Sequence, residues 1–371
     1  DPATTETYTL SLHAALPILD RLGVWAEAVY KKGDTYRDHG DFTIQNYALK
    51  AAYDFSEALR GLVQLEWFDD YSRLADGLSL AAFRDDPTQN LSRKNRFEGD
   101  QLRANFRLEW TIDERSRLDL SGYAFTGDRT FYLGSPSFYG RDPNYVDATP
   151  RPMSVWAIQP QYTRGYELGD LDGELVAGLR YQEEDITRKA ERFASSGTKT
   201  VRSDNTYDYQ ALSIFVENSF RHGGLSVTPG VRIEVVDIAA KNELSGVSVD
   251  RDFNELLPAL GASYMVAEEW SVYGNIQSSF QPPQANHVEI SSNSQDFSAE
   301  YAWTYEIGTR GSLCDGLIAP DLTLYWINYK DRIERHPDYF DVFLNVGNTR
   351  HRGAELALDP QAQRRAMRHA Q

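Results

Sequence analysis

Residues 102–110 read LRANFRLEW, and apolar residues alternate there with charged or polar ones. Side chains of a β-strand point alternately to opposite faces, so this stretch predicts a strand with one apolar and one polar face. The same alternation recurs at 225–235 and 303–310. Such stretches run to about ten residues, as a tilted strand needs to cross a bilayer, whereas strands of soluble proteins average about 5–6. The pattern therefore predicts membrane-crossing strands.

The composition agrees with one large β architecture. The 371 residues include 22 Tyr and 17 Phe, which favour strands, yet only 41% of the residues are hydrophobic. A barrel with lipid outside and water or a plug inside needs only an apolar outer face, so its mean hydropathy stays low. No run of 18 apolar residues occurs, which excludes a transmembrane helix. It does not exclude a membrane, because a closed barrel also pairs every backbone group internally.

Charged side chains occupy the polar face of the predicted strands. Examples are Arg103, Arg107, Arg232, Glu234 and Glu306. Burying these charges in a solid soluble core would be costly, whereas a wet lumen accommodates them. This contrast favours a barrel over a large β-sandwich. The formal net charge of −17 argues against nucleic acid as a partner, because phosphate binding needs a basic face.

The connections between strands alternate between short polar turns and long polar loops such as 71–100, 129–152 and 281–300. Outer-membrane barrels have short periplasmic turns and long extracellular loops, so we predict an all-β, antiparallel transmembrane β-barrel. Trp303 and Trp326 lie near strand ends, where aromatic side chains favour the lipid–water boundary. The fourteen predicted strands are 21–30, 43–54, 59–70, 101–111, 116–128, 153–164, 174–188, 207–220, 225–238, 256–266, 270–280, 301–312, 321–331 and 348–358.

The two ends of the chain lie outside the predicted strands. Residues 1–19 lack the cationic start of a signal peptide, and the string 4–18 resembles translated adaptor sequence, so we expect 1–19 to be non-native. Residues 359–371 are basic and lack the alternation, which predicts a non-native or out-of-frame tail. We therefore assign the partial barrel to residues 20–358.

Three strings carry a family resemblance. Residues 302–310 (AWTYEIGTR), 345–355 (NVGNTRHRGAE) and 229–234 (PGVRIE) resemble strands of TonB-dependent outer-membrane receptors. Residues 256–280 and the loop around 77–90 resemble the ferric dicitrate type of that family. The resemblance spans about residues 20–358.

The resemblance implies a 22-stranded barrel filled by an N-terminal plug, in the outer membrane of a Gram-negative bacterium. About fourteen strands, the third to the sixteenth, are then present, and the plug is missing. We therefore expect a fragment that is not transport-competent by itself. The implied partners are a ferric chelate, the TonB–ExbB–ExbD energy complex acting through the plug, and outer-membrane lipid and lipopolysaccharide. The resemblance further implies a monomer that is not an enzyme.

Ferric citrate is anionic, and arginine pairs with carboxylates through a planar guanidinium that keeps its charge. The string 149–152 (TPRP) looks like the subgroup's Arg-Pro strand entry, and Gln284 matches a loop glutamine of the family. The other candidates rest on their position at the long loops. The predicted ligand-binding residues are Arg129, Arg141, Arg151, Gln281, Gln284 and His287. No resident cofactor or metal is expected, because ferric iron enters only within the chelated substrate.

Alternatives remain open at this stage. Each of these side chains also fits a solvated loop, and aromatic residues around them would equally suit an aryl or catechol siderophore. A passive porin-type channel, a TonB-dependent receptor for another substrate, and a surface adhesin or extracellular β-sandwich are the rival functions. Enzyme signatures such as Gly-x-Ser-x-Gly and His-Glu-x-x-His are absent from the sequence.

Overall fold

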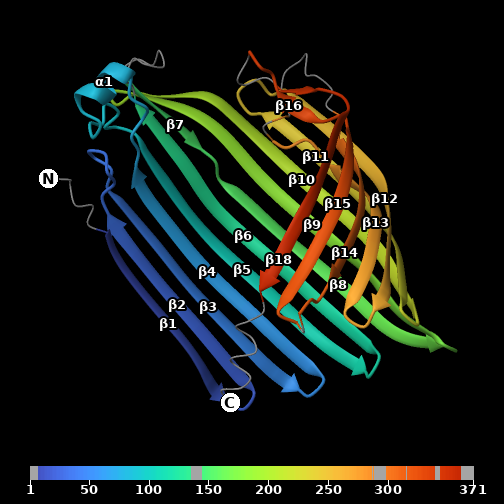
Figure 1. Cartoon of the computed structure of the whole chain (residues 1–371). Coiled ribbons are helices and arrows are strands. Elements are labelled where there is room, and N and C mark those ends of the chain that lie inside the picture. The colour runs from blue at the N-terminus through green and yellow to red at the C-terminus, as the bar shows by residue number, and fades with distance from the viewer. Residues whose placement is uncertain are drawn as a thin grey trace.

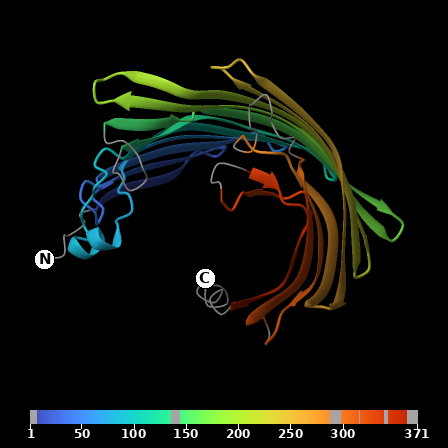
Figure 2. The same cartoon turned by 90° about the horizontal axis from the view of Figure 1, so that it is seen from above.

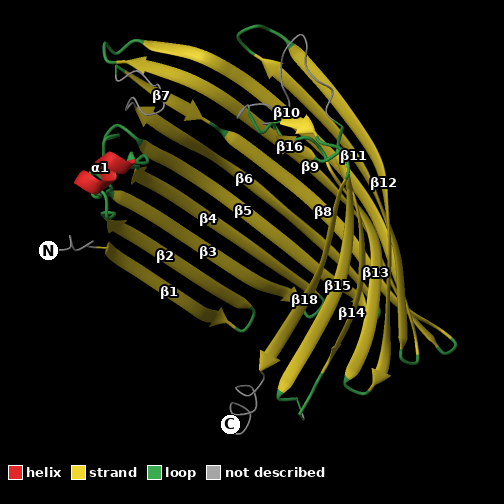
Figure 3. Cartoon of the chain, turned by 45° about the horizontal axis from the view of Figure 1, so that its top comes forward, coloured by secondary structure: helices red, strands yellow, loops and turns green. Residues whose placement is uncertain are grey.

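A computed structural model describes residues 7–134, 144–285, 287, 298–314, 316–338 and 343–360, with side chains from residue 20 to residue 359. These residues form a 16-stranded antiparallel sheet in which successive strands pair, except that two successive strands share one position and a separate two-stranded sheet comes before the last strand. α1 (Leu80–Asp85) is the one helix among them, as Figure 3 shows. No helix in the described ranges is long and apolar enough to span a membrane.

The strands are long, and most of them cross the whole height of the sheet (Figure 1). A small second sheet pairs β16 (Ile333–Arg335) with β17 (Phe343–Asn345). The strands of the main sheet are β1 (Thr7–Leu19), β2 (Leu22–Gly33), β3 (Phe42–Ser56), β4 (Leu59–Arg73), β5 (Arg96–Asp113), β6 (Ser116–Gly134), β7 (Tyr145–Pro150), β8 (Met153–Leu168), β9 (Leu171–Ala194), β10 (Lys199–His222), β11 (Leu225–Asn242), β12 (Ser248–Ala267), β13 (Trp270–Gln281), β14 (Glu300–Gly311), β15 (Ile318–Lys330) and β18 (Thr349–Pro360).

The sheet bends into an open arc when it is seen from above (Figure 2). β1 and β18 form its two edges, and within the described chain they pair only with β2 and β15. Short turns join the strands at one end of the arc, and long connections join them at the other (Figure 1). We call these the short-turn end and the long-loop end.

One face of the sheet is apolar and exposed, as the alternation predicts. Leu102 is 49% exposed, Trp110 47% and Ile307 64%, so large apolar side chains point away from the protein rather than into a core. Soluble proteins bury such residues, and a contiguous apolar surface marks contact with a partner or a membrane. This face is the convex side of the arc.

The opposite face is polar, and its charges pair with one another across neighbouring strands. Asp119 on β6 is nearly buried and accepts hydrogen bonds from Arg107 at 3.1 Å and Arg117 at 2.6 Å. On β10 and β11, Arg232 pairs with Glu234 and donates to the Ser213 hydroxyl at 2.8 Å. The concave face therefore carries charges without a hydrophobic core, because each charge has a partner or meets solvent.

Each of the fourteen predicted ranges corresponds to a strand, with at most one residue outside it, and most strands extend further than predicted at the long-loop end. The sequence interpretation missed β1, β7, α1 and the short pair β16 and β17. Residues 7–19, which the sequence predicts to lie outside the barrel, form β1, and β1 pairs with β2 along its length. β7 lies within the predicted loop 129–152, because the sheet continues beyond the apolar zone.

The predicted loop 71–100 contains the missed helix, α1. The Ser79 hydroxyl caps this helix by accepting from the Ala82 N–H at 3.2 Å. The Arg37 side chain donates to the Gln89 carbonyl oxygen at 2.8 Å and thereby ties the loop to the connection between β2 and β3. Such contacts join segments far apart in the sequence, so local sequence patterns give no sign of them.

The apolar convex face generates a test of the membrane assignment. Replacing Ile307 with arginine puts a charge on this face, and we expect a cost of about 2–4 kcal/mol if the site lies deep in hydrocarbon. Urea unfolding of the protein in lipid vesicles measures this cost. Thr304→Arg, on the polar face of the same strand, is the control and should cost much less. Equal effects of the two substitutions would show that the convex face does not meet lipid.

Candidate ligand site at the long-loop end

A break flanked by two prolines lies between β7 and β8. Both strands occupy the same position in the sheet, between β6 and β9. Proline has no N–H to give to a ladder, so Pro150 and Pro152 interrupt the pairing on either side of Arg151. The Arg151 N–H instead donates to the Arg129 carbonyl oxygen at 3.1 Å and lies 3.3 Å from Asp128 Oδ1. These bonds hold Arg151 at the entry to β8.

The strand register brings three arginines into one row. Arg129 on β6 lies across from Arg151, and Arg151 lies across from Arg188 on β9, since the pairings on both sides of the break keep one register. All three positions fall on the polar face. Adjacent strands are about 4.8 Å apart, so three guanidinium groups share a small area near the long-loop end. We call these residues the arginine row.

The arginine row is strongly positive, and no described carboxylate neutralises its charges through an ion pair. None of the three arginines makes an ion pair with a carboxylate in the part of the chain that the structure describes. Arg151 lies between strands, beyond the apolar zone, and burial lowers its pKa, with further lowering by the positive charges of Arg188 and Arg129. Arg151 and Arg188 are partly buried and Arg129 is exposed; like charges at this spacing repel one another, and a bound anion would relieve the repulsion.

The next strand adds an amide to the row. Asn205 on β10 pairs directly with Arg188, and its side-chain oxygen Oδ1 is buried with no hydrogen-bond partner in the structure. A buried polar atom without a partner is unusual in proteins. The row therefore presents three cationic donors and ends at an unsatisfied polar group.

The connection that follows β13 folds back onto the arginine row. Arg188 Nη1 donates to the Ala285 carbonyl oxygen at 3.2 Å, and the Tyr209 hydroxyl lies 3.4 Å from the Pro283 carbonyl oxygen. Residues nearly a hundred positions apart in the sequence thus meet on the concave face. The start of this loop covers the row from β9 and β10.

A short turn shapes that loop. The Gln284 N–H donates to His287 Nδ1 at 3.2 Å, so Nδ1 is unprotonated there. The His287 ring packs on Phe343 with 4.6 Å between ring centroids, which joins the turn to β17. Burial lowers the pKa of His287, while Glu300 acts in the opposite direction. The turn therefore carries a neutral imidazole at neutral pH.

The structure brings together four of the six predicted ligand residues. Arg129 and Arg151 belong to the row, and Gln284 and His287 lie in the turn beside Ala285. Gln281 ends β13, where it pairs with Glu300, and it has no side-chain contact to the row. Arg141 lies outside the described residues. The sequence interpretation missed Arg188, the last residue of a predicted strand; counting register across three strands would have been needed to find it.

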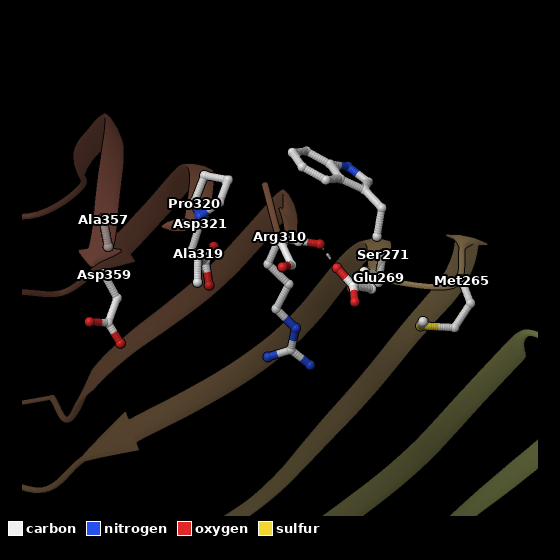
Figure 4. Close-up of a pocket in the computed structure, with 12 residues that line it drawn as sticks. Met265, Glu269, Ser271, Arg310, Ala319, Pro320, Asp321, Ala357 and Asp359 are labelled. Atoms are coloured by element: carbon white, nitrogen blue, oxygen red, sulfur yellow. Dashed lines mark hydrogen bonds between the residues drawn. The ribbon is translucent and has the colours of Figure 1, made fainter. Parts of the chain in front are cut away.

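A pocket lies at the short-turn end, away from the arginine row. Its volume is about 510 Å³, and it opens between the ends of β12 to β15 and β18 (Figure 4). Its charged lining residues are Glu269, Arg310, Asp321 and Asp359, and Trp270 and Pro320 also line it. It contains none of the predicted ligand residues. Among the described residues, no group of three or more His, Cys, Asp or Glu side chains is arranged to hold a metal ion.

Comparison with known proteins places the chain in a family. The sequence model of the TonB dependent receptor-like β-barrel matches residues 30–365, so the chain belongs to this family. The family consists of transporters, not enzymes, in the outer membrane of Gram-negative bacteria. The predicted class and location are thus confirmed, as is the all-β antiparallel fold.

Solved structures show the same fold. The unliganded ferric citrate transporter FecA matches with a TM-score of 0.81 and 24% identity, over 97% of this chain and 54% of FecA. The ferric-catecholate import receptor Fiu from E. coli K12 matches with a TM-score of 0.76 and 15% identity, over 96% and 62%. The ferric yersiniabactin uptake receptor FyuA from Yersinia pestis gives 0.76 and 13%, over 96% and 57%. The chain thus spans a little more than half of these receptors.

The His287 turn generates a pH prediction. Because the folded pKa of His287 is below its ordinary value, about 6.5, protonation disfavours the docked turn. The turn is therefore most stable above that value, loses stability as the pH falls below it, and is weakest below the folded pKa. Spin labelling at Gln284→Cys, in a Cys314→Ser background, should report higher mobility on acidification. His287→Gln should remove this transition; an unchanged pH profile would contradict the assignment.

Proposed function

We propose that this chain is the ligand-capturing part of an outer-membrane receptor that imports ferric citrate, or a related carboxylate-rich ferric siderophore, with energy from TonB. The arginine row carries the proposal, because Arg129, Arg151 and Arg188 form an unneutralised cationic cluster at the end of the sheet with long loops. In a chain of net charge −17, such a cluster needs an anionic partner.

The chemistry of the row fits carboxylates. A guanidinium group offers parallel N–H donors in a plane, which match the two oxygens of a carboxylate, and it keeps its charge even when partly buried. Three such groups at strand spacing can bind several carboxylates of one chelate simultaneously. Ferric citrate exposes carboxylates around its iron, and the iron remains cargo rather than a cofactor of the protein.

In this proposal, the loop after β13 links ligand binding at the arginine row to a change in loop position. Arg188 donates to the Ala285 carbonyl oxygen, so a carboxylate that approaches the row competes with this carbonyl for the same donor. Binding therefore changes how residues 281–287 dock on β9 and β10. Capture, loop rearrangement and a subsequent plug movement driven by TonB–ExbB–ExbD are the proposed steps, and only the first two involve residues of this chain.

A catecholate siderophore is the second candidate. Rings of Tyr209, Phe343 and His287 lie around the loop that covers the row, and aromatic surfaces suit aryl ligands. The fold similarity to Fiu is compatible with this candidate but does not select it. Both candidates are anionic ferric chelates, so direct titration has to separate them.

Arginine substitutions test the proposal. Arg151→Gln and Arg188→Gln each remove a charged donor worth about 1.5–3 kcal/mol, so we expect ferric citrate to bind about tenfold to a hundredfold more weakly. Tryptophan fluorescence of the receptor expressed from its complete gene, titrated with ferric citrate and with a ferric catecholate, measures the affinity. Arg180→Gln is the matched control, because Arg180 lies lower on the same face of β9 and bonds to Tyr123 and Gln182.

Each outcome has a distinct meaning. Binding of the catecholate but not of ferric citrate at micromolar concentration would refute the citrate assignment and leave the anion site in place. Wild-type affinity in both arginine variants would show that the row is not the site. Ion conductance of the receptor in planar bilayers separates a gated receptor, which should be nearly silent, from a passive porin-type channel.

A further inference from the structure

A cationic and aromatic patch lies on the convex face, away from the arginine row. It is formed by three strands near one edge of the arc, β14, β15 and β18. Its members are Trp303, Tyr305, Trp326, Asn328, Arg350 and Arg352. We call these residues the outer basic patch.

The register places the patch in two adjacent rows. Tyr305 pairs with Trp326, which pairs with Arg352. In the next row toward the long-loop end, Trp303 pairs with Asn328, which pairs with Arg350. All these positions share the exposed parity of their strands, since Trp303 is 39% exposed, and Tyr305 and Trp326 are each 41% exposed. The patch therefore faces outward rather than into the concave side.

Apolar side chains continue the same face toward the short-turn end. Ile307 and Leu324 pair below the aromatic row, and Leu356 and Leu358 extend the surface along β18, each at least half exposed. Tryptophan and tyrosine mark the lipid–water boundary in membrane proteins. The patch thus lies where an outer-membrane barrel meets the head groups of the outer leaflet, with hydrocarbon-facing residues beneath it.

The two arginines of the patch have no counter-charge among the described residues. The Arg352 guanidinium lies 4.0 Å from the centroid of the Trp326 ring, and the Trp326 indole N–H donates to Asn328 at 2.8 Å. Neither Arg350 nor Arg352 forms an ion pair with a carboxylate within the described ranges. The indole orients one guanidinium and leaves its N–H groups available to an external anion.

Acidic residues gather elsewhere on the outward face, at the long-loop end. Asp69, Asp100 and Asp128 stand side by side on β4, β5 and β6, and Asp185 pairs with Asp208 on β9 and β10. These positions share the parity of the apolar residues on their strands. A phosphate head group is repelled there and attracted at the outer basic patch, so charge complementarity selects one sector of the barrel.

We propose that the outer basic patch docks a phosphorylated glycolipid of the outer leaflet. Its phosphates pair with Arg350 and Arg352, its sugar rings lie against the aromatic side chains, and its acyl chains pack on Ile307, Leu324 and Leu356. The proposal is independent of the substrate, because the patch and the arginine row lie on opposite faces of the sheet.

Lipid binding by purified receptor tests the proposal. The probe is deep-rough lipopolysaccharide, compared with the same lipid after enzymatic dephosphorylation and with inorganic phosphate. EDTA is present throughout, so that no metal ion can bridge phosphate to the aspartates. Native mass spectrometry in detergent measures bound lipid. The Arg350→Gln/Arg352→Gln double variant should bind about tenfold more weakly, and added salt should reduce the difference.

A control variant removes the same charge and the same kind of ring contact from the concave face. Lys50 lies over the Trp25 ring at 4.8 Å and Arg310 over the Tyr273 ring at 5.6 Å, so Lys50→Gln/Arg310→Gln should bind glycolipid as the wild type does. Heat-modifiable gel migration verifies that both variants are folded. Equal binding of phosphorylated and dephosphorylated lipid would overturn the proposal, as would equal losses in both double variants. Displacement of the lipid by inorganic phosphate at matched concentration would reduce the patch to a simple anion site.

Discussion

Backbone pairing between neighbouring strands is the interaction on which the rest of this structure depends. Few apolar side chains are buried, and large ones such as Ile307 and Trp110 are exposed, so a hydrophobic core does not hold the sheet together. Each strand is held by the ladders on its two sides. In hydrocarbon this is a strong constraint, because an unpaired N–H or C=O group has no water to bond.

The same ladders decide which side chains meet. A slip of one residue in a strand would move every side chain to the other face, so the register fixes both the apolar convex face and the polar concave face. It also places Arg129, Arg151 and Arg188 in one row. Along the chain, neighbours in this row are up to 37 positions apart. The charge cluster is therefore a product of register rather than of a local motif.

The long-loop end combines regular strands with contacts that cross the arc. Arg188 on β9 reaches the carbonyl oxygen of Ala285, and Asn345, the last residue of β17, bonds to the backbone of Ser298 and Asp331. These bonds connect the loop after β13 to the loop after β15, above the rigid sheet. A ligand that engages the sheet can thus affect two loops, which suits a receptor whose capture step has to be transmitted.

The sequence by itself determined the strands, their two faces and the family, because alternation and short strings such as 302–310 depend only on neighbours along the chain. It also pointed to Arg129 and Arg151, which lie beside recognisable strand ends. Only the tertiary structure added Arg188, the strand β7 and the docking of Ala285, and it left Gln281 apart from the row. The physical reason is that these features depend on which strands pair, and in what register, which residues adjacent in sequence do not encode.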